Sequence, residues 1–225
     1  MQGFDLAPRD AIALQKELAR QVELRPLAAR PRTIGGCDVS MNRFAKEGFA
    51  GFVTLSYPDL IGIDRSSVKD AIPFPYIPGL LSFREIPMLM KAWERLETKP
   101  DVLMVDGIGI AHPRRLGIAS HLGLLLGIPT IGVAKSVLTG THEEPGPEPG
   151  DRAPLSDTKT GEVIGMALRT KRRVRPVFVS PGHLITLDDA VTLVMQSVRA
   201  HRLPEPTRHA HLFVNEARMA QTEAA

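Results

Sequence analysis

With 225 residues, 43% of them hydrophobic and 24% charged, the chain has the size and composition of one globular domain, and two full domains would be cramped. Its net charge of +3 permits a nucleic-acid partner without requiring one, and its single cysteine, Cys37, excludes an internal disulfide and a thiolate metal cluster. The longest nearly apolar stretch, residues 122–134, is too short to span a bilayer. We therefore expect one domain over residues 1–225, a monomer without membrane association, and a cytoplasmic location, since Met1–Asp5 does not resemble a signal peptide.

The first part of the chain predicts one helix followed by three strands. Apolar residues at helical spacing indicate a helix over Ala11–Leu24. Alternating and β-branched patterns then predict three strands that could form an antiparallel meander: Thr33–Val39, Gly51–Tyr57 and Leu60–Asp64.

A proline-rich loop and a second helix come next. Pro73–Gly79 holds three prolines, which restrict the backbone. A helix should begin near Glu85 with Pro87 in its first turn, where a missing N–H has no cost.

The middle of the chain has the pattern of a βαβ unit. Val102–Val105 is a continuously apolar strand, and a glycine-rich loop follows it. Pro113 should open a helix that runs to about Leu126, and Thr130–Ala134 is the next strand. The two strands should be parallel neighbours in one sheet.

The remaining residues predict a loop, a hairpin and two helices. Residues 141–160 are rich in Pro, Gly and charge and are expected to form a mobile loop. The elements expected after it are strands over Glu162–Arg169 and Pro176–Ser180 and helices over Leu187–His201 and from Pro206 to about Gln221. The sum is an α/β protein with a mixed sheet, antiparallel first and parallel later, flanked by helices.

Two aspartates occupy strand positions, where this residue type is unfavourable. Asp38 ends or interrupts the apolar strand around Cys37, and Asp106 follows Val102–Val105 directly. Each could simply face solvent or cap a turn. However, Asp106 and Lys135 follow consecutive strands of the βαβ unit, so both should emerge at the carboxyl edge of the sheet, where ligands bind. They could form a salt bridge there, or act as a metal ligand and a phosphate-orienting cation.

Converging carboxylates suit Mg²⁺, a hard ion that prefers oxygen ligands and serves phosphodiester cleavage. Asp38, Glu85 and Asp106 lie on separate elements and could converge in this way, although the pattern alone does not force this choice among 25 acidic residues. Among the histidines, His112, His183 and His211 stand out by their surroundings, and each could equally serve as a cap or a turn hydrogen-bond partner.

Two further features admit a functional and a structural interpretation. Tyr76 lies between prolines that stiffen its loop, so its ring could cover an apolar edge or stack on a nucleic-acid base. Basic residues crowd one segment, which is either a solvated hairpin tip or a phosphate-contacting patch: Arg169, Lys171, Arg172, Arg173 and Arg175.

Six short segments, taken together in this order, resemble the endonuclease V family from about Gly35 to His211. No single segment is decisive, but the set and its spacing are highly specific. The segments are GCDVS at 36–40, PYIPGLLSFRE at 75–85, DGIGIAHPR at 106–114, GVAK at 132–135, SPGH at 180–183 and RLPEPTR at 202–208.

The resemblance implies an RNase H-like fold and a DNA repair activity. It implies hydrolysis of the second phosphodiester bond 3′ to deoxyinosine, a deaminated adenine, leaving 3′-OH and 5′-phosphate ends. The expected cofactor is Mg²⁺, with Mn²⁺ as a substitute, and the expected partner is inosine-containing DNA or RNA, because some relatives prefer inosine in RNA.

The resemblance also assigns roles by motif position. Asp38, Glu85 and Asp106 would ligate the metal, Lys135 would contact the cleaved phosphate, and His211 would lie in the active site where relatives often have Asp. Tyr76 would be a wedge that fills the gap left by a flipped base. The pocket that binds this base would involve Gly79, Leu81, Gly107, His112 and Ile118.

One residue departs from the family pattern, which usually reads Asp-Gly-His-Gly where this chain has Asp106-Gly107-Ile108-Gly109. Ile108 cannot hydrogen-bond a phosphate or a water through its side chain, so we expect an altered rate or substrate preference. It is also the one feature that favours a non-catalytic inosine-binding module. The retained Asp38, Glu85 and Asp106 argue against such a module. A small-molecule enzyme, the third alternative, leaves Tyr76 without an obvious role.

Overall fold

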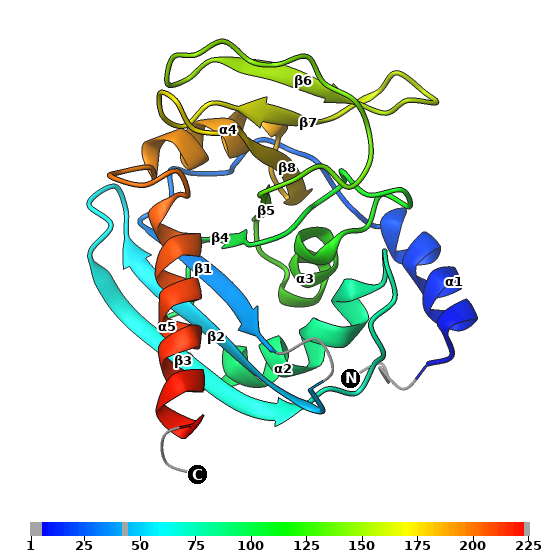
Figure 1. Cartoon of the computed structure of the whole chain (residues 1–225), viewed down its shortest axis with the longest axis vertical. Coiled ribbons are helices and arrows are strands. Elements are labelled where there is room, and N and C mark those ends of the chain that lie inside the picture. The colour runs from blue at the N-terminus through cyan, green and yellow to red at the C-terminus, as the bar shows by residue number, and fades with distance from the viewer. Residues whose placement is uncertain (1–5, 42–44, 223–225) are drawn as a thin grey trace.

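One mixed sheet runs through the computed structural model, which describes residues 6–41 and 45–222 (Figure 1). The expectation about Met1–Asp5 lies outside the described residues. The strand order is β3-β2-β1-β4-β5-β8-β7-β6. The strands are β1 (Thr33–Ser40), β2 (Glu47–Ser56), β3 (Gly62–Ala71), β4 (Val102–Val105), β5 (Thr130–Ala134), β6 (Arg152–Ser156), β7 (Val163–Leu168) and β8 (Val177–His183). The helices are α1 (Pro8–Ala19), α2 (Leu81–Arg95), α3 (Ile118–Leu126), α4 (Leu187–Gln196) and α5 (Glu205–Thr222).

The pairing of the strands confirms the predicted mixed α/β architecture. Strands β1, β2 and β3 form an antiparallel meander, whereas β4 is parallel to both β1 and β5. The sheet continues with antiparallel β8, β7 and β6, so the predicted hairpin of β7 and β8 is also present. The carboxyl ends of β1, β4 and β5 therefore meet at one edge of the sheet.

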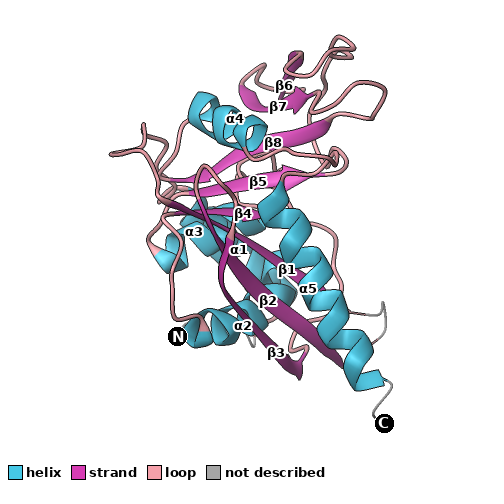
Figure 2. Ribbon diagram, turned by 90° about the vertical axis from the view of Figure 1, so that its left-hand side faces the viewer, coloured by secondary structure: helices cyan, strands magenta, loops and turns pink. Residues whose placement is uncertain are grey.

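Helices cover both faces of the sheet because its central strands are apolar on both sides (Figure 2). In β4, Met104 packs in the cluster that includes α4, whereas Leu103 and Val105 pack with α2 and α3. Helix α5 lies along β1 and β2 (Figure 1). Among the described helices, none combines the length and the apolar character that a bilayer crossing demands.

The close approach of α5 to β1 depends on Gly36. A Cβ atom built at this position would lie 1.9 Å from the carbonyl oxygen of Pro206 at the start of α5. Any side chain there would push the helix away from the strand. This approach is what brings His211 beside Asp38.

Helix α1 was predicted over Ala11–Leu24, but it begins and ends earlier, at Pro8 and Ala19. Pro8 opens the helix with its fixed φ angle, as prolines favour. The helix does not continue because the backbone of Glu23 pairs with the end of β8. Its N–H donates to Nδ1 of His183 (3.2 Å), and its carbonyl accepts from the N–H of Leu184 (2.7 Å).

Helix α2 was predicted to begin near Glu85, but it begins at Leu81, so Pro87 lies inside the helix and not in its first turn. Burial explains this, since Phe83 and Ile86 are 0% exposed and anchor the turn that precedes the proline. The helix tolerates the proline because packing outweighs the lost hydrogen bond.

The helix predicted from Pro113 begins instead at Ile118. The residues before it form a folded loop, in which the N–H of Gly117 donates to Gly109 and the N–H of Ala119 donates to Ile108. These bonds satisfy the backbone without a helix, so the proline pattern was misleading.

Three predictions in the last third of the chain were also wrong. Residues 141–160 are not only a loop, because they contain the edge strand β6, whose residues alternate between exposed and buried. The strand predicted over Pro176–Ser180 extends to His183, so this histidine ends β8 with a buried side chain and does not lie in a turn after the strand. Helix α4 ends at Gln196 and does not reach His201, since the N–H groups of Ser197 and Val198 donate to carbonyls three residues back, which tightens and closes the last turn.

Candidate active site

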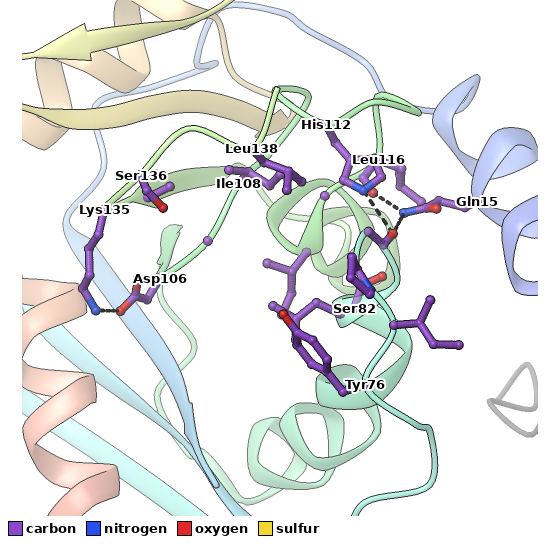
Figure 3. A pocket seen from close by; sticks show the side chains of 18 residues that line it. Gln15, Tyr76, Ser82, Asp106, Ile108, His112, Leu116, Lys135, Ser136 and Leu138 are labelled. Atoms are coloured by element: carbon purple, nitrogen blue, oxygen red, sulfur yellow. Dashed lines mark hydrogen bonds and ion pairs between the residues drawn. The ribbon is translucent and has the colours of Figure 1, made fainter. Parts of the chain in front are cut away.

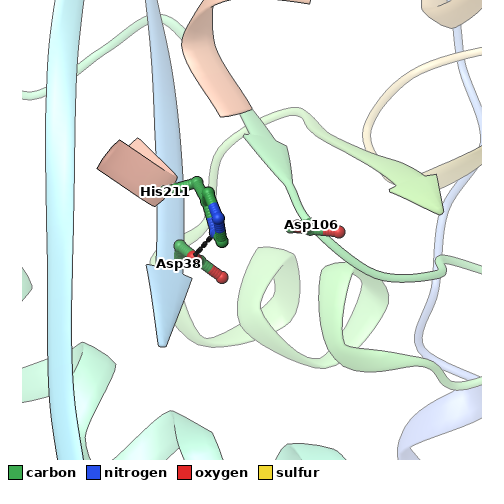
Figure 4. Close-up of side chains that lie close together, drawn as sticks. All are labelled: Asp38, Asp106 and His211. Atoms are coloured by element: carbon green, nitrogen blue, oxygen red, sulfur yellow. Dashed lines mark hydrogen bonds and ion pairs between the residues drawn. The ribbon is translucent and has the colours of Figure 1, made fainter. Parts of the chain in front are cut away.

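The sheet register places two aspartates side by side at the carboxyl edge. Cys37 of β1 pairs with Val105 of β4, so the next residues, Asp38 and Asp106, are level with each other. Helix α5 adds His211 from the face that Gly36 opens (Figure 4). The candidate ligand atoms of Asp38, Asp106 and His211 all lie within 4.8 Å of one another.

Each aspartate has one close side-chain partner. Nδ1 of His211 lies 2.8 Å from Oδ2 of Asp38, and Nζ of Lys135 lies 2.5 Å from Oδ2 of Asp106. The aspartate side chains are only 13% and 15% exposed, so both charges are held largely away from water. The expected convergence of Asp106 and Lys135 at one edge is confirmed, here as an ion pair.

Burial and neighbouring negative charge raise the pKa of two carboxyl groups in this region, those of Asp38 and Glu85. Burial and the charge of Asp106 raise the pKa of Asp38 above its usual value, although the hydrogen bond to His211 lowers it in part. Burial raises the pKa of Glu85 to about 8, with further contributions from the charges of Asp38 and Asp106. Crowded carboxylates that resist ionisation are relieved by a bound cation. The donor set, carboxylate oxygens and one imidazole nitrogen, fits a divalent metal ion.

Glu85 reaches this region from another direction. It lies in α2, on the face of the sheet opposite α5, and its side chain is half-buried. Its charge couples with those of the aspartates, but its oxygens lie outside the group of atoms within 4.8 Å. The structure thus brings Asp38, Asp106 and His211 together directly, whereas Glu85 approaches from the opposite face of the sheet and lies farther away.

A cavity of about 330 Å³ opens beside the aspartates (Figure 3). Asp106 and Lys135 form one of its walls, so the cavity adjoins the acidic cluster of Asp38, Glu85 and Asp106 and shares Asp106 with it. The predicted wedge and the residues predicted to bind the base all line this one cavity: Tyr76, Gly79, Leu81, Gly107, His112 and Ile118.

The loop that forms the other wall is fixed by its last residue. Gly79 has a φ of +79°, a conformation that favours glycine. Its carbonyl accepts hydrogen bonds from Nε2 of Gln15 (3.1 Å), Nη2 of Arg114 (2.8 Å) and Nε2 of His112 (3.1 Å). Three donors on one oxygen hold this end of the loop in place, and two of them, Gln15 and His112, are drawn in Figure 3.

The contacts of His112 define its tautomer. Burial, with the charge of Arg114, lowers the pKa of His112 to about 4, so the ring is neutral at physiological pH. Nδ1 accepts from the backbone N–H of Arg114 (3.0 Å), so the proton is on Nε2, which donates to Gly79.

Gln15 was missed by the sequence analysis. It is 1% exposed in α1, and Nε2 also donates to the carbonyl of Leu116 (2.7 Å). A signal was present, because Ala11, Gln15 and Leu18 share the helical spacing of the buried face. A glutamine in such a stripe needs hydrogen-bond partners and therefore marks a polar contact inside the protein.

Tyr76 and Ile108 lie at different places around the cavity. Tyr76 lines the cavity and is 59% exposed, so its ring stands at the mouth. Ile108 lines the wall that follows Asp106 and is half-buried. An apolar side chain therefore faces the cavity where the family pattern has an imidazole.

The basic segment is neither a solvated tip nor a uniform phosphate patch. Arg169 is 8% exposed, pairs with Glu144 and donates to the carbonyl of Pro145 (2.9 Å). Arg172 pairs with Glu148, and Lys171 donates to a carbonyl just after α4. Arg173 and Arg175, by contrast, are exposed and form no ion pair with any described residue.

A mixed sheet with aspartates at the carboxyl ends of adjacent parallel strands, a lysine on the next strand and a cavity beside them defines a class, the nucleases of RNase H-like fold. Comparison with known protein families, relatives and solved structures agrees with this class and identifies the family within it. The family model described as Endonuclease V matches residues 16–212, and the chain belongs to the endonuclease V family.

Relatives and solved structures match over nearly the whole chain. An endonuclease V of Myxococcus xanthus is 49% identical, over 99% of this chain and 94% of the relative. The crystal structure of endonuclease V from Streptomyces avermitilis is 38% identical, with a TM-score of 0.92 over 99% of this chain and 97% of that one. The endonuclease V of Ciona intestinalis, solved with a 23mer DNA that contains an inosine followed by a ribo-adenosine, is 28% identical, with a TM-score of 0.84 over 94% and 98%. The chain is therefore a nuclease.

Proposed function

We propose that this nuclease is a DNA repair enzyme that hydrolyses the second phosphodiester bond 3′ to deoxyinosine and leaves 3′-OH and 5′-phosphate ends. The observation that carries the proposal is the shared wall of Asp106 and Lys135. It places a cavity of about 330 Å³ directly beside the acidic cluster, so a base held in the cavity keeps the neighbouring phosphodiester within reach of the carboxylates. The Ciona relative, crystallised with an inosine-containing DNA, supports this choice of substrate.

The acidic cluster would hold Mg²⁺, or Mn²⁺ as a substitute, through Asp38, Asp106 and Glu85. Such an ion activates water and stabilises the leaving oxygen of an in-line displacement. His211, 2.8 Å from Asp38, would orient this carboxylate, and their hydrogen bond opposes part of the rise in the pKa of Asp38. The Nζ atom of Lys135, which pairs with Asp106 at this edge of the sheet, would bind a phosphate oxygen of the cleaved bond.

The cavity would select the base. A deaminated adenine pairs weakly, so its extrusion from a duplex costs less than that of a normal base. Tyr76, exposed at the mouth of the cavity, would fill the vacated space. Because the carbonyl of Gly79 already accepts three hydrogen bonds, the loop offers a rigid wall of backbone groups for the hypoxanthine edge, together with Leu81, Gly107 and Ile118.

The test is strand cleavage of end-labelled oligonucleotides with one inosine, prepared as DNA and as RNA, with Mg²⁺, Mn²⁺ or a chelator. The proposal expects metal-dependent cutting of the DNA strand and none of an adenine control. Preferential cutting of the RNA strand would make the protein an inosine-specific endoribonuclease instead. Tight inosine-dependent binding without any cutting would overturn the catalytic proposal in favour of a binding module.

A further inference from the structure

A second groove, of about 510 Å³, adjoins the cavity of the candidate active site. The two hollows share Lys135 and Ser136, which follow β5. From there the groove extends along the start of β8 and the turn that connects β7 to β8, past Arg173 and Arg175. Lys135 therefore stands between the cavity on one side and the groove on the other.

The groove is strongly basic. The only acidic residue among those that line it is Glu144, and its charge is compensated by Arg169 at 2.5 Å. Lys135, Arg173 and Arg175 line the same groove, and the latter two have no ion-pair partner among residues 6–41 and 45–222. The uncompensated charge of the groove is thus positive.

A further arginine, Arg202, lies next to the residues that line the groove. Arg202 donates to the carbonyls of Lys135 (3.2 Å) and Pro176 (2.7 Å), which fixes it beneath the floor of the groove. Burial lowers the pKa of Arg202, and the charge of Arg175 lowers it further. Cations held together without acids repel one another, and a polyanion in the groove relieves this repulsion.

The groove also contains an aromatic pair. The rings of His142 and Phe178 lie 5.0 Å apart between their centroids, and both side chains are half-buried. Cations that follow a groove together with partly exposed rings are the features that bind single-stranded nucleic acids, since the backbone pairs with the cations and bases stack on the rings.

We propose that this groove binds the substrate strand beyond the scissile phosphate, with Arg173 and Arg175 on backbone phosphates and Phe178 against a base. A strand whose inosine fills the cavity passes Lys135 and then enters the groove. The assignment to the 3′ side rests on the proposed function, because it follows from a cut 3′ to the inosine.

The test compares two double variants that each remove two exposed cations. Arg173→Gln/Arg175→Gln changes the groove, whereas Arg152→Gln/Lys159→Gln is the matched control on β6 and the turn after it, outside the groove. Binding is followed by fluorescence anisotropy across a salt series, in a chelator so that no strand is cut. Three single strands with one inosine serve as probes: one long on both sides, one shortened on the 3′ side and one shortened on the 5′ side.

The groove variant should bind the long and the 5′-shortened strands more weakly and lower the salt slope by about 1.4, which is about 0.7 for each lost phosphate contact. It should match the wild type on the 3′-shortened strand, and the control should match it on all three. Phe178→Leu should weaken binding of the long strand about fivefold or more without changing the salt slope. An unchanged slope for the groove variant, or the same loss on the 3′-shortened strand, would overturn the proposal.

A fourth strand, with adenine in place of inosine, separates this proposal from the proposed function. If the wild type does not distinguish inosine from adenine, the proposed function fails, while the loss of salt slope in the groove variant still establishes the groove. If the wild type prefers inosine but the groove variant keeps the wild-type slope, the proposed function stands and the groove proposal is wrong.

Discussion

The acidic cluster and the base cavity are adjacent, but they are built in different ways. The two aspartates of the cluster lie on or directly after strands, and the pairing of Cys37 with Val105 sets them at the same level. The cavity is lined largely by loops, and side chains distant in sequence, such as Gln15, hold two of these loops in place. A sheet register cannot shift by a fraction of a residue, whereas a loop held by a few hydrogen bonds can. Changes in the cluster should therefore affect the chemistry, and changes around the cavity should affect recognition.

Loss of a carboxylate from the cluster should have the largest effect. Asp106→Ala should lower the single-turnover cleavage rate by more than about 100-fold, because loss of a mere outer partner of a metal ligand already costs about 10–100-fold in affinity or activity. Affinity for an inosine-containing strand should stay measurable, and Asp59→Ala, an exposed turn residue, is the control. An active Asp106→Ala variant would remove Asp106 from the catalytic machinery.

The second-largest effect should be that of acid on the packing of α3 against the cavity wall. Burial lowers the pKa of His121 in α3 to about 4, and its Nδ1 lies 3.1 Å from the hydroxyl of Ser82, which lines the cavity. A folded-state pKa below the unfolded value of about 6.5 means that this stability is present above pH 6.5 and is lost as the pH falls toward 4. The loss is about 3 kcal/mol in the free energy of unfolding.

Urea unfolding of the wild type and His121→Asn at pH 7 and pH 4 measures this effect. His112 also has a pKa of about 4 and contributes a loss of stability in acid, whereas the raised pKa of Glu85 has the opposite effect, and both contributions are common to the two proteins. Between pH 7 and pH 4, the free energy of unfolding should fall less in the variant than in the wild type, and the difference is the contribution of His121. Equal losses would show that His121 is not the group that takes up the proton.

Removal of the Tyr76 ring should act on recognition alone. Stacking on a base contributes about 1–3 kcal/mol, so Tyr76→Ala should weaken affinity for an inosine strand by about fivefold or more. The cleavage rate at saturating protein should change much less, and Tyr76→Phe, which keeps the ring, is the matched control. Unchanged affinity in Tyr76→Ala would contradict the wedge.

Replacement of Ile108 should have the smallest effect. Ile108→His restores a hydrogen-bonding side chain on the cavity wall next to Asp106, with little change in volume. We expect a change of a few fold in rate or in the preference for DNA over RNA, measured on paired inosine strands. A gain of several orders of magnitude would mean that Ile108 had nearly silenced the nuclease.

The strands that hold the aspartates could be predicted from the sequence more closely than the loops that line the cavity. The strands Val102–Val105 and Thr130–Ala134 were predicted to the residue, since a short apolar run ended by a polar or turn residue permits few alternatives. Because these strands are parallel, the meeting of Asp106 and Lys135 also followed from the sequence.

Tertiary contacts set the features that the sequence did not predict. Pro113 indicated a helix start, but hydrogen bonds from Gly117 and Ala119 back to the preceding loop hold the chain in another form. Arg169 looked like part of a charged tip, yet carbonyls and Glu144 bind its guanidinium inside the protein. Such contacts join residues that are not neighbours in the sequence, and a local sequence pattern does not predict them.

Mapping the cut at single-nucleotide resolution tests most directly the claim that a cavity selects the base while the adjacent carboxylates cut the strand. The inosine is moved stepwise along otherwise identical DNA strands, and the products are sized after incubation with Mg²⁺. The account predicts one cut that moves with the inosine and always falls at the second phosphodiester bond on its 3′ side. A cut that stays with the surrounding sequence, or that falls at a variable distance from the inosine, would contradict it.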